Sequence, residues 1–170
     1  CGSTHRVVLR RMRRVNGMSN RIELDDIDKQ LLRALQKNGR AAYAEMGEEV
    51  GLTAPAVRAR IQRMRDRGLL QIVAVTDPIA LGHTESAILA IRVDGDPRRV
   101  ADELGKIPNI VYMVITMGGY DLMCEIVCEN REIFADLVQH QIREIPGIRS
   151  VDAFPYTDIH THRFTWGVPQ

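Results

Sequence analysis

The N-terminal part of the chain repeats apolar residues at helical spacing. One such stretch covers residues 27–35, a second covers residues 42–50 and a third covers residues 53–67. Gly51 follows the second stretch and suits the left-handed position at which many helices end. Short helices joined by a two-residue turn are typical of a helix-turn-helix, which we assign to residues 21–70.

The third predicted helix has an apolar side and a contrasting polar side. In a helical projection Val57, Ile61 and Met64 lie together and are expected to face the core. The opposite side and the N-cap carry small residues, one amide and flanking arginines: Thr53, Pro55, Arg58, Ala59, Gln62 and Arg63.

This polar side predicts a helix that enters the major groove of DNA. We expect Gln62 and Arg58 to contact base edges and Arg63 to neutralise a phosphate. Arg60 lies closer to the core side, where a structural ion pair is the expected role. The alternative is a solvated basic helix, because arginine is a good helix former.

From residue 72 the pattern changes to short strands alternating with helices. Residues 72–75 are a β-branched run that predicts a hinge strand. The elements expected after it are strand 86–93, a helix from 97, strands 110–116 and 121–128, helix 131–143 and strand 148–156. The order βαββαβ predicts an α+β fold with a C-terminal ferredoxin-like sandwich.

The distribution of charged residues differs between the two halves of the chain. The chain of 170 residues is 45% hydrophobic and 26% charged, which is typical of a globular protein that buries a core. Residues 1–22 hold six arginines and no acid, whereas residues 72–170 hold eight basic and fourteen acidic residues. A basic N-terminal part on an otherwise acidic chain indicates that the N-terminal part binds a polyanion. Residues 1–20 are expected to be a disordered extension, with a minor-groove arm or a transit peptide as alternatives.

Several other classes of protein are not expected. The longest apolar run, residues 110–117, is far shorter than a membrane span, and the odd number of cysteines fits a reducing cytoplasm. No nucleophile and base arrangement or phosphate-binding glycine loop is visible, so no catalytic residue is assigned and the protein is not expected to be an enzyme. Cys124 and Cys128 are expected to be buried thiols rather than metal ligands.

The combination of these features resembles the Lrp/AsnC family of feast/famine transcription regulators. The resemblance spans residues 23–160. It is carried by Leu24-Asp25-Asp26-Ile27-Asp28, Asn38-Gly39-Arg40, Glu49-Val50-Gly51-Leu52-Thr53, Val57-Arg58-Ala59-Arg60-Ile61 and Gly119-Tyr120-Asp121. Two departures are Ala42, where the family often has a capping Ser or Thr, and Gly47, which replaces a common Ala. Each is expected to weaken the second helix by about 1 kcal/mol.

The resemblance implies a cytoplasmic, nucleoid-associated regulator of double-stranded DNA with a winged-type helix-turn-helix and a RAM-type C-terminal domain. It implies homodimers that assemble into tetramers or octamers, and an amino-acid effector at the interface, with no other cofactor. The effector site of the family corresponds here to the loop of Thr116, Met117, Gly118, Gly119, Tyr120 and Asp121. Asp121 suits an ammonium group and the glycine N–H groups suit a carboxylate. The alternative is that the glycines only make the turn and Asp121 caps a strand end.

The expected organisation has five parts. They are a basic extension (1–20), a DNA-binding domain (21–70), a hinge strand and linker (71–80), an effector-binding and oligomerisation domain (81–160) and a tail (161–170). A competing hypothesis is a small-molecule-binding sandwich whose N-terminal helices do not read DNA. Another is a metal or redox sensor that uses the cysteines and His160-Thr161-His162.

Overall fold

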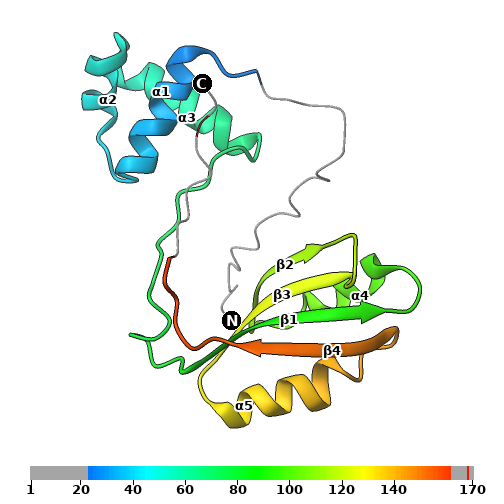
Figure 1. Cartoon of the computed structure of the whole chain (residues 1–170). Helices are drawn as coiled ribbons and strands as arrows, with labels where there is room; N and C mark the ends of the chain where they lie inside the picture. Colours follow the sequence, from blue (N-terminus) through cyan, green and yellow to red (C-terminus); the bar gives the residue numbers. More distant parts are fainter. Residues whose placement is uncertain (1–22, 162–167, 169–170) are drawn as a thin grey trace, which may run out of the picture. The chain divides into compact units, whose positions relative to one another are not determined.

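The computed structural model describes residues 23–161 and Val168, which form two compact units (Figure 1). One unit holds residues 23–74 together with Val168, and the other holds residues 75–161. The buried apolar side chains form two separate clusters, one in each unit. Each unit therefore has a hydrophobic core of its own.

The first unit consists of three helices: α1 (Asp26–Lys37), α2 (Tyr43–Val50) and α3 (Ala54–Asp66). Asp25 caps α1, because its Oδ1 accepts a hydrogen bond from the backbone N–H of Asp28 at 2.7 Å. Gly51 has φ 71° and makes the left-handed turn between α2 and α3. One apolar side of each helix supplies the core residues Leu31, Leu32, Leu35, Met46, Val57, Ile61 and Met64. The three helices expected from apolar spacing are confirmed.

Gly47 lies where α2 meets the turn that leads into α3. A Cβ at this position would lie only 2.4 Å from the carbonyl oxygen of Leu52, and the Gly47 carbonyl accepts a hydrogen bond from the Leu52 N–H at 2.8 Å. The expectation that Gly47 only weakens the helix was therefore incomplete, because glycine also permits this close approach. Ala42 occupies the N-cap of α2 without a side-chain capping bond, as expected.

The second unit is a four-stranded antiparallel sheet with two helical segments. Its elements are β1 (Glu85–Val93), α4 (Pro97–Leu104), β2 (Ile110–Ile115), β3 (Leu122–Cys128), α5 (Arg131–Asp136), the π-helical turn η1 (Leu137–Ile142) and β4 (Ile148–Pro155). The strand order is β2-β3-β1-β4, with β1 and β3 in the centre. This is the expected βαββαβ order.

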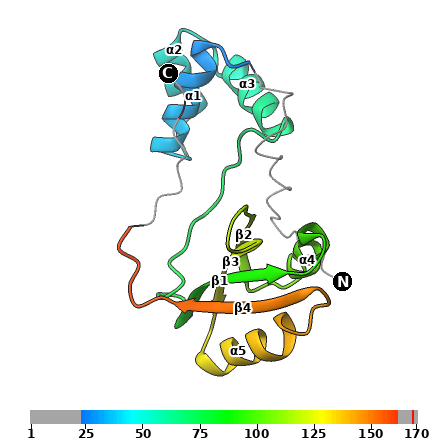
Figure 2. The ribbon, with the colours of Figure 1, turned by 45° about the vertical axis from the view of Figure 1, so that its right-hand side comes forward.

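Within residues 75–161 the helices cover one face of this sheet. Ala87, Leu89 and Ile91 alternate along β1 and are buried in the same cluster as Leu104 of α4 and Leu137 of η1. In both views α5 runs along the β4 side of the sheet (Figures 1 and 2). Alternate strand residues therefore form the core, and the remaining strand residues lie on an open face.

Two expected elements differ from the structure. The hinge strand at residues 72–75 is wrong: residues 71–77 are neither helix nor strand, and Val73 is 55% exposed. A β-branched run becomes a strand only when a neighbouring chain completes its hydrogen bonds, and no strand pairs with it within residues 23–161. The helix expected at residues 131–143 becomes π-helical at Leu137 and ends at Ile142.

The two cysteines of β3 are buried thiols, as expected. Cys124 and Cys128 both belong to the core cluster, and burial raises the pKa of Cys124 to about 12 and also raises that of Cys128. Within the described part of the chain no three side chains are placed to hold a metal ion. His160 is exposed, and His162 lies outside the described residues. None of the helices described here has the length and apolarity to cross a membrane.

The contact between Gly47 and Leu52 predicts that a side chain at position 47 destabilises the helix-turn-helix unit. Gly47→Val should lower the free energy of unfolding by about 2 kcal/mol, because the added atoms meet backbone that cannot move freely. Urea unfolding followed by circular dichroism measures this loss. Glu48→Val is the matched control at an exposed position of the same helix, and equal losses in the two variants would contradict the steric explanation.

Candidate nucleic-acid interface and ligand loop

One side of α3 is buried and the opposite side is exposed. Val57, Ile61 and Met64 are at most 1% exposed, because they pack into the core of the first unit. The six residues expected to meet DNA are all exposed: Thr53, Pro55, Arg58, Ala59, Gln62 and Arg63. The structure therefore brings these residues onto one accessible surface of a single helix.

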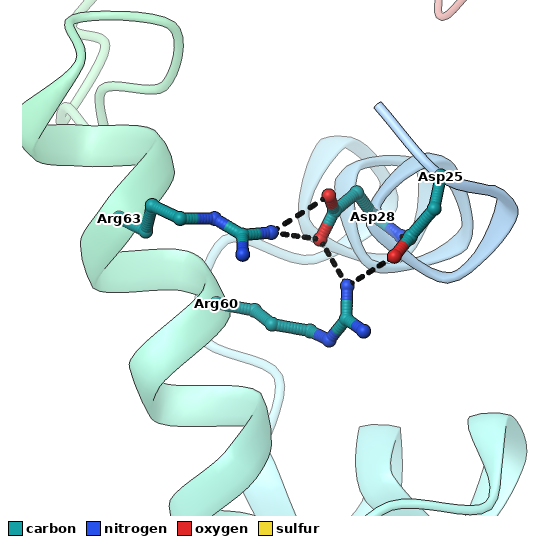
Figure 3. Close-up of polar contacts among 4 residues, drawn as sticks. All are labelled: Asp25, Asp28, Arg60 and Arg63. Carbon is teal, nitrogen blue, oxygen red and sulfur yellow. Dashed lines mark hydrogen bonds and ion pairs between the residues drawn. The ribbon is translucent and has the colours of Figure 1, made fainter. Parts of the chain in front are cut away.

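A buried carboxylate ties this helix to α1 (Figure 3). Asp28 of α1 is only 2% exposed, and its oxygens accept hydrogen bonds from Arg60 at 2.9 Å and from Arg63 at 2.9 and 3.2 Å. Arg60 also donates to Asp25 at 2.6 Å. A carboxylate removed from water needs such partners, so two arginines of α3 stabilise one anion of α1. The expected ion pair of Arg60 is confirmed.

The ionisation of this cluster follows from its contacts. The capping N–H of Asp28 and the Arg60 guanidinium hold the pKa of Asp25 below its ordinary value. Asp25 and Asp28 in turn raise the pKa of Arg60. Asp25 and Arg60 are therefore both charged at neutral pH, and their opposite charges attract across the two helices.

The same contacts qualify the expected role of Arg63. Its guanidinium is bound through Nη2 to both oxygens of Asp28, although the side chain remains 48% exposed. Sequence reasoning treated Arg63 as a phosphate contact alone and did not see this partner. Arg63 has an internal anion to neutralise, so any contact with phosphate shares the guanidinium with Asp28.

The loop between β2 and β3 is held by hydrogen bonds at its base and is open at its tip. Thr116 donates its backbone N–H to the carbonyl of Asp121 at 2.9 Å and its hydroxyl to the carbonyl of Tyr120 at 2.6 Å. Met117 is 94% exposed, and Gly118 has φ 146°, a conformation that favours glycine. A Cβ on either glycine would meet no atom within 4 Å, so the backbone at the tip is accessible.

Asp121 has a structural role at the base of this loop. Its Oδ2 accepts a hydrogen bond from the Val93 N–H at 2.8 Å, and its own N–H donates to the Ile91 carbonyl at 2.9 Å. These bonds extend the pairing of β1 with β3 by one step beyond the Ile91–Leu122 pair. The strand-end role that the sequence left open is therefore present, and it uses one of the two carboxylate oxygens.

Arg92 is a residue of this region that sequence reasoning missed. Its Nε donates to the Gly119 carbonyl at 3.0 Å, and its guanidinium carbon lies 4.2 Å from the centre of the Tyr120 ring. Its Nη1 reaches Asp152 at 3.2 Å and Ser150 at 3.3 Å, both on β4. The available signal was a charged residue directly after the apolar run 87–91, because such a residue needs partners in a sheet.

Comparison with known proteins agrees with this architecture. The AsnC-type helix-turn-helix domain matches residues 24–65, and the PF0864 C-terminal dimeric alpha+beta barrel domain matches residues 84–169. The HTH-type transcriptional regulator FL11 of Pyrococcus horikoshii is 33% identical over 154 residues, which cover 88% of this chain and 98% of that protein.

Solved structures show the same fold. The leucine response regulatory protein (LrpA) of Mycobacterium tuberculosis matches with a TM-score of 0.75 at 27% identity, over 82% of this chain and 96% of that one. A transcriptional regulator of Neisseria meningitidis, solved as an L-Met complex, matches with a TM-score of 0.74 at 21% identity, over 86% of this chain and 97% of that one.

The fold and the exposed face of α3 define a two-domain DNA-binding transcriptional regulator rather than an enzyme. The chain belongs to the Lrp/AsnC family.

The buried carboxylate generates a prediction about stability. Asp28→Ala leaves two partly buried arginines without their anion and should lower the free energy of unfolding by about 2 kcal/mol, less than for a fully buried pair because both arginines retain some contact with water. Asp26→Ala is the matched control: its side chain is 89% exposed, and its loss should be below about 0.5 kcal/mol. Urea unfolding compares the two variants. Equal stabilities would show that the Asp28 cluster does not hold α3 against α1.

Proposed function

We propose that the protein is a sequence-specific regulator whose α3 enters the major groove of DNA and whose C-terminal unit binds an amino acid or a related small effector. The observation that carries the DNA part is the exposed side of α3, where Ala59 and Gln62 lie between arginines while the opposite side is buried. Small residues allow close approach to the groove, an amide pairs with base edges, and arginines bind phosphate or guanine.

The roles of the individual side chains follow from their contacts. Arg58 is exposed, so we assign it to bases or phosphates together with Gln62. Arg63 supports the helix through Asp28 and contributes its remaining N–H groups to a phosphate. Thr53 and Pro55 open the helix at the end that approaches the groove in most helix-turn-helix proteins.

The effector part of the proposal concerns residues 116–121. The relative from Neisseria meningitidis was solved as an L-Met complex, which supports a ligand of this class. The open backbone at Gly118 and Gly119 offers N–H groups to a carboxylate, and Oδ1 of Asp121 is left to accept from an ammonium group. Arg92 holds the loop at Gly119 and Tyr120 and so limits its movement before a ligand arrives.

Assembly is assigned to the open face of the sheet. Ile88 pairs with Phe154 across β1 and β4, and Tyr112 pairs with Glu125 across β2 and β3, so all four strands contribute to this face. Phe154 is 53% exposed, and the description of the matching family as dimeric supports a second copy as the partner. We propose homodimers through this face that assemble further into tetramers or octamers.

Two polar side chains on the same face are hydrogen-bonded to each other within one chain. The Tyr156 hydroxyl donates to Oε1 of Glu125 at 2.9 Å. Burial and the neighbouring carboxylate raise the pKa of Tyr156 to about 12, so the phenol stays protonated at neutral pH. The Tyr156 hydroxyl therefore already has an acceptor within its own chain when this face is covered.

DNA recognition is tested by selecting a preferred operator from random DNA with the full chain. Gln62→Ala should weaken binding to that operator by about 1 to 3 kcal/mol and leave binding to random DNA nearly unchanged, because base contacts carry the sequence preference. Arg99→Ala, on the exposed side of α4 in the other unit, is the control and should change neither. Fluorescence anisotropy measures both affinities, and equal losses of Gln62→Ala on the two DNAs would refute base readout by this residue.

Effector recognition is tested with Asp121→Asn, which keeps an oxygen for the Val93 N–H but removes the charge. Loss of an ion pair with the ammonium group should weaken binding of the preferred amino acid at least about tenfold. Calorimetric titration with the twenty amino acids measures the affinities, and sedimentation of the same samples shows whether the ligand shifts assembly. Asp94→Asn, at an exposed position, is the control. Unchanged affinity in Asp121→Asn would refute the role of this carboxylate, and a wild type that binds none of the twenty would refute an amino acid as the effector.

A further inference from the structure

A single carboxylate lies at the end of the helix that is proposed to enter DNA. Asp66 is the last residue of α3 and its only acid. It follows Gln62 by four residues, so the two side chains are neighbours on the helix surface. The Gln62 amide nitrogen donates a hydrogen bond to Oδ1 of Asp66 at 2.7 Å.

General electrostatics do not favour an acid in this place. The last turn of a helix carries a partial negative charge, which disfavours a carboxylate. The negative phosphates of approaching DNA also repel a carboxylate here. The positive charges of Arg63 and Arg65, in the last turn of α3, suit both the helix end and the phosphates. The contact that the structure shows for Asp66 is the one to Gln62, and this contact bears on base recognition.

The bond sets the direction in which the Gln62 amide points. An ionised carboxylate only accepts hydrogen bonds, so the amide must present its nitrogen to Asp66. The amide oxygen is then turned away from Asp66. In the absence of the carboxylate the amide is free to rotate by half a turn and to present its nitrogen instead.

The surroundings of the pair add a second restriction. Gln62, Arg65 and Asp66 line an open pocket of about 690 Å³ together with residues 70–74. The segment that follows α3 therefore flanks the pair on one side, while both side chains remain exposed. Neighbouring chain on one side reduces the number of rotamers that Gln62 can adopt.

We propose that Asp66 is a specificity-determining positioning residue, which holds Gln62 so that its amide oxygen faces the base edge. In the major groove only adenine N6 and cytosine N4 donate hydrogen bonds, whereas guanine and thymine present acceptors at the corresponding positions. Gln62 therefore favours adenine or cytosine at the base it meets and disfavours guanine and thymine. This inference rests on the proposed base readout by Gln62.

The test uses the full chain and the operator selected by the wild type. Affinities for the four bases at each position locate the base pair whose discrimination is lost in Gln62→Ala. The wild type should prefer adenine or cytosine there by about tenfold or more. Asp66→Ala should reduce this ratio to below about threefold and leave discrimination at the other base pairs in place.

Two further variants separate the orientation of the Gln62 amide from the effects of net charge and side-chain size. Asp66→Asn keeps the size of the side chain and its ability to form a hydrogen bond with Gln62. Because an amide both donates and accepts, it can bind the Gln62 amide in either orientation, so this variant should lose the discrimination as well. Glu49→Ala removes one exposed acid from α2 and controls for the change in net charge, which should alter affinity for all DNAs alike. Thermal unfolding of each variant shows that the unit stays folded.

The possible results distinguish the role of Asp66 from the proposed base readout by Gln62, on which it rests. A wild type that selects no preferred sequence, or an operator on which Gln62→Ala loses no discrimination, overturns base readout by Gln62 and with it the role of Asp66. A preference lost in Gln62→Ala but kept in Asp66→Ala overturns the role of Asp66 alone. A wild-type preference for guanine or thymine at that base pair also overturns it.

Discussion

The buried carboxylate of Asp28 is the contact on which the recognition surface depends. It lies on α1 and is bound by Arg60 and Arg63 of α3, so the two helices are joined by charge as well as by apolar packing. An anion with 2% exposure is stable only while both partners remain in reach. The rotation of α3 about its own axis is therefore constrained, and the side that carries Arg58 and Gln62 is held toward solvent.

The loop at residues 116–121 of the second unit is organised by the same kind of interaction. Arg92 binds the carbonyl of Gly119 and the carboxylate of Asp152, so the loop is tied to the edge strand β4. Asp121 extends the ladder between β1 and β3 with its side chain. In both units a charged side chain with several partners positions the residues that are proposed to act on DNA or on a ligand. Such contacts are directional, whereas apolar burial alone leaves a surface free to shift.

Much of the architecture was predictable because it depends on local sequence. Apolar spacing, the Asp25 cap and Gly51 predict the three helices, and alternation along the strands predicts the sandwich. The segment at residues 72–75 was mispredicted for a physical reason: its composition favours a strand, but pairing requires a neighbour that the composition cannot supply. The close approach of the Leu52 carbonyl to Gly47 could likewise not be predicted from the sequence, because this carbonyl belongs to the turn beyond the helix.

The sequence by itself determined the helix-turn-helix, the βαββαβ order, the exposed side of α3 and the family. These follow from periodicity and short motifs, which are read within a few residues of chain. Only the tertiary structure decided the partners of the charged side chains: Asp28 with Arg63, Arg92 with Gly119 and Asp152, and Asp121 with Val93. These pairs join residues 27 to 60 positions apart, and their formation depends on distances and burial that arise after the chain has folded.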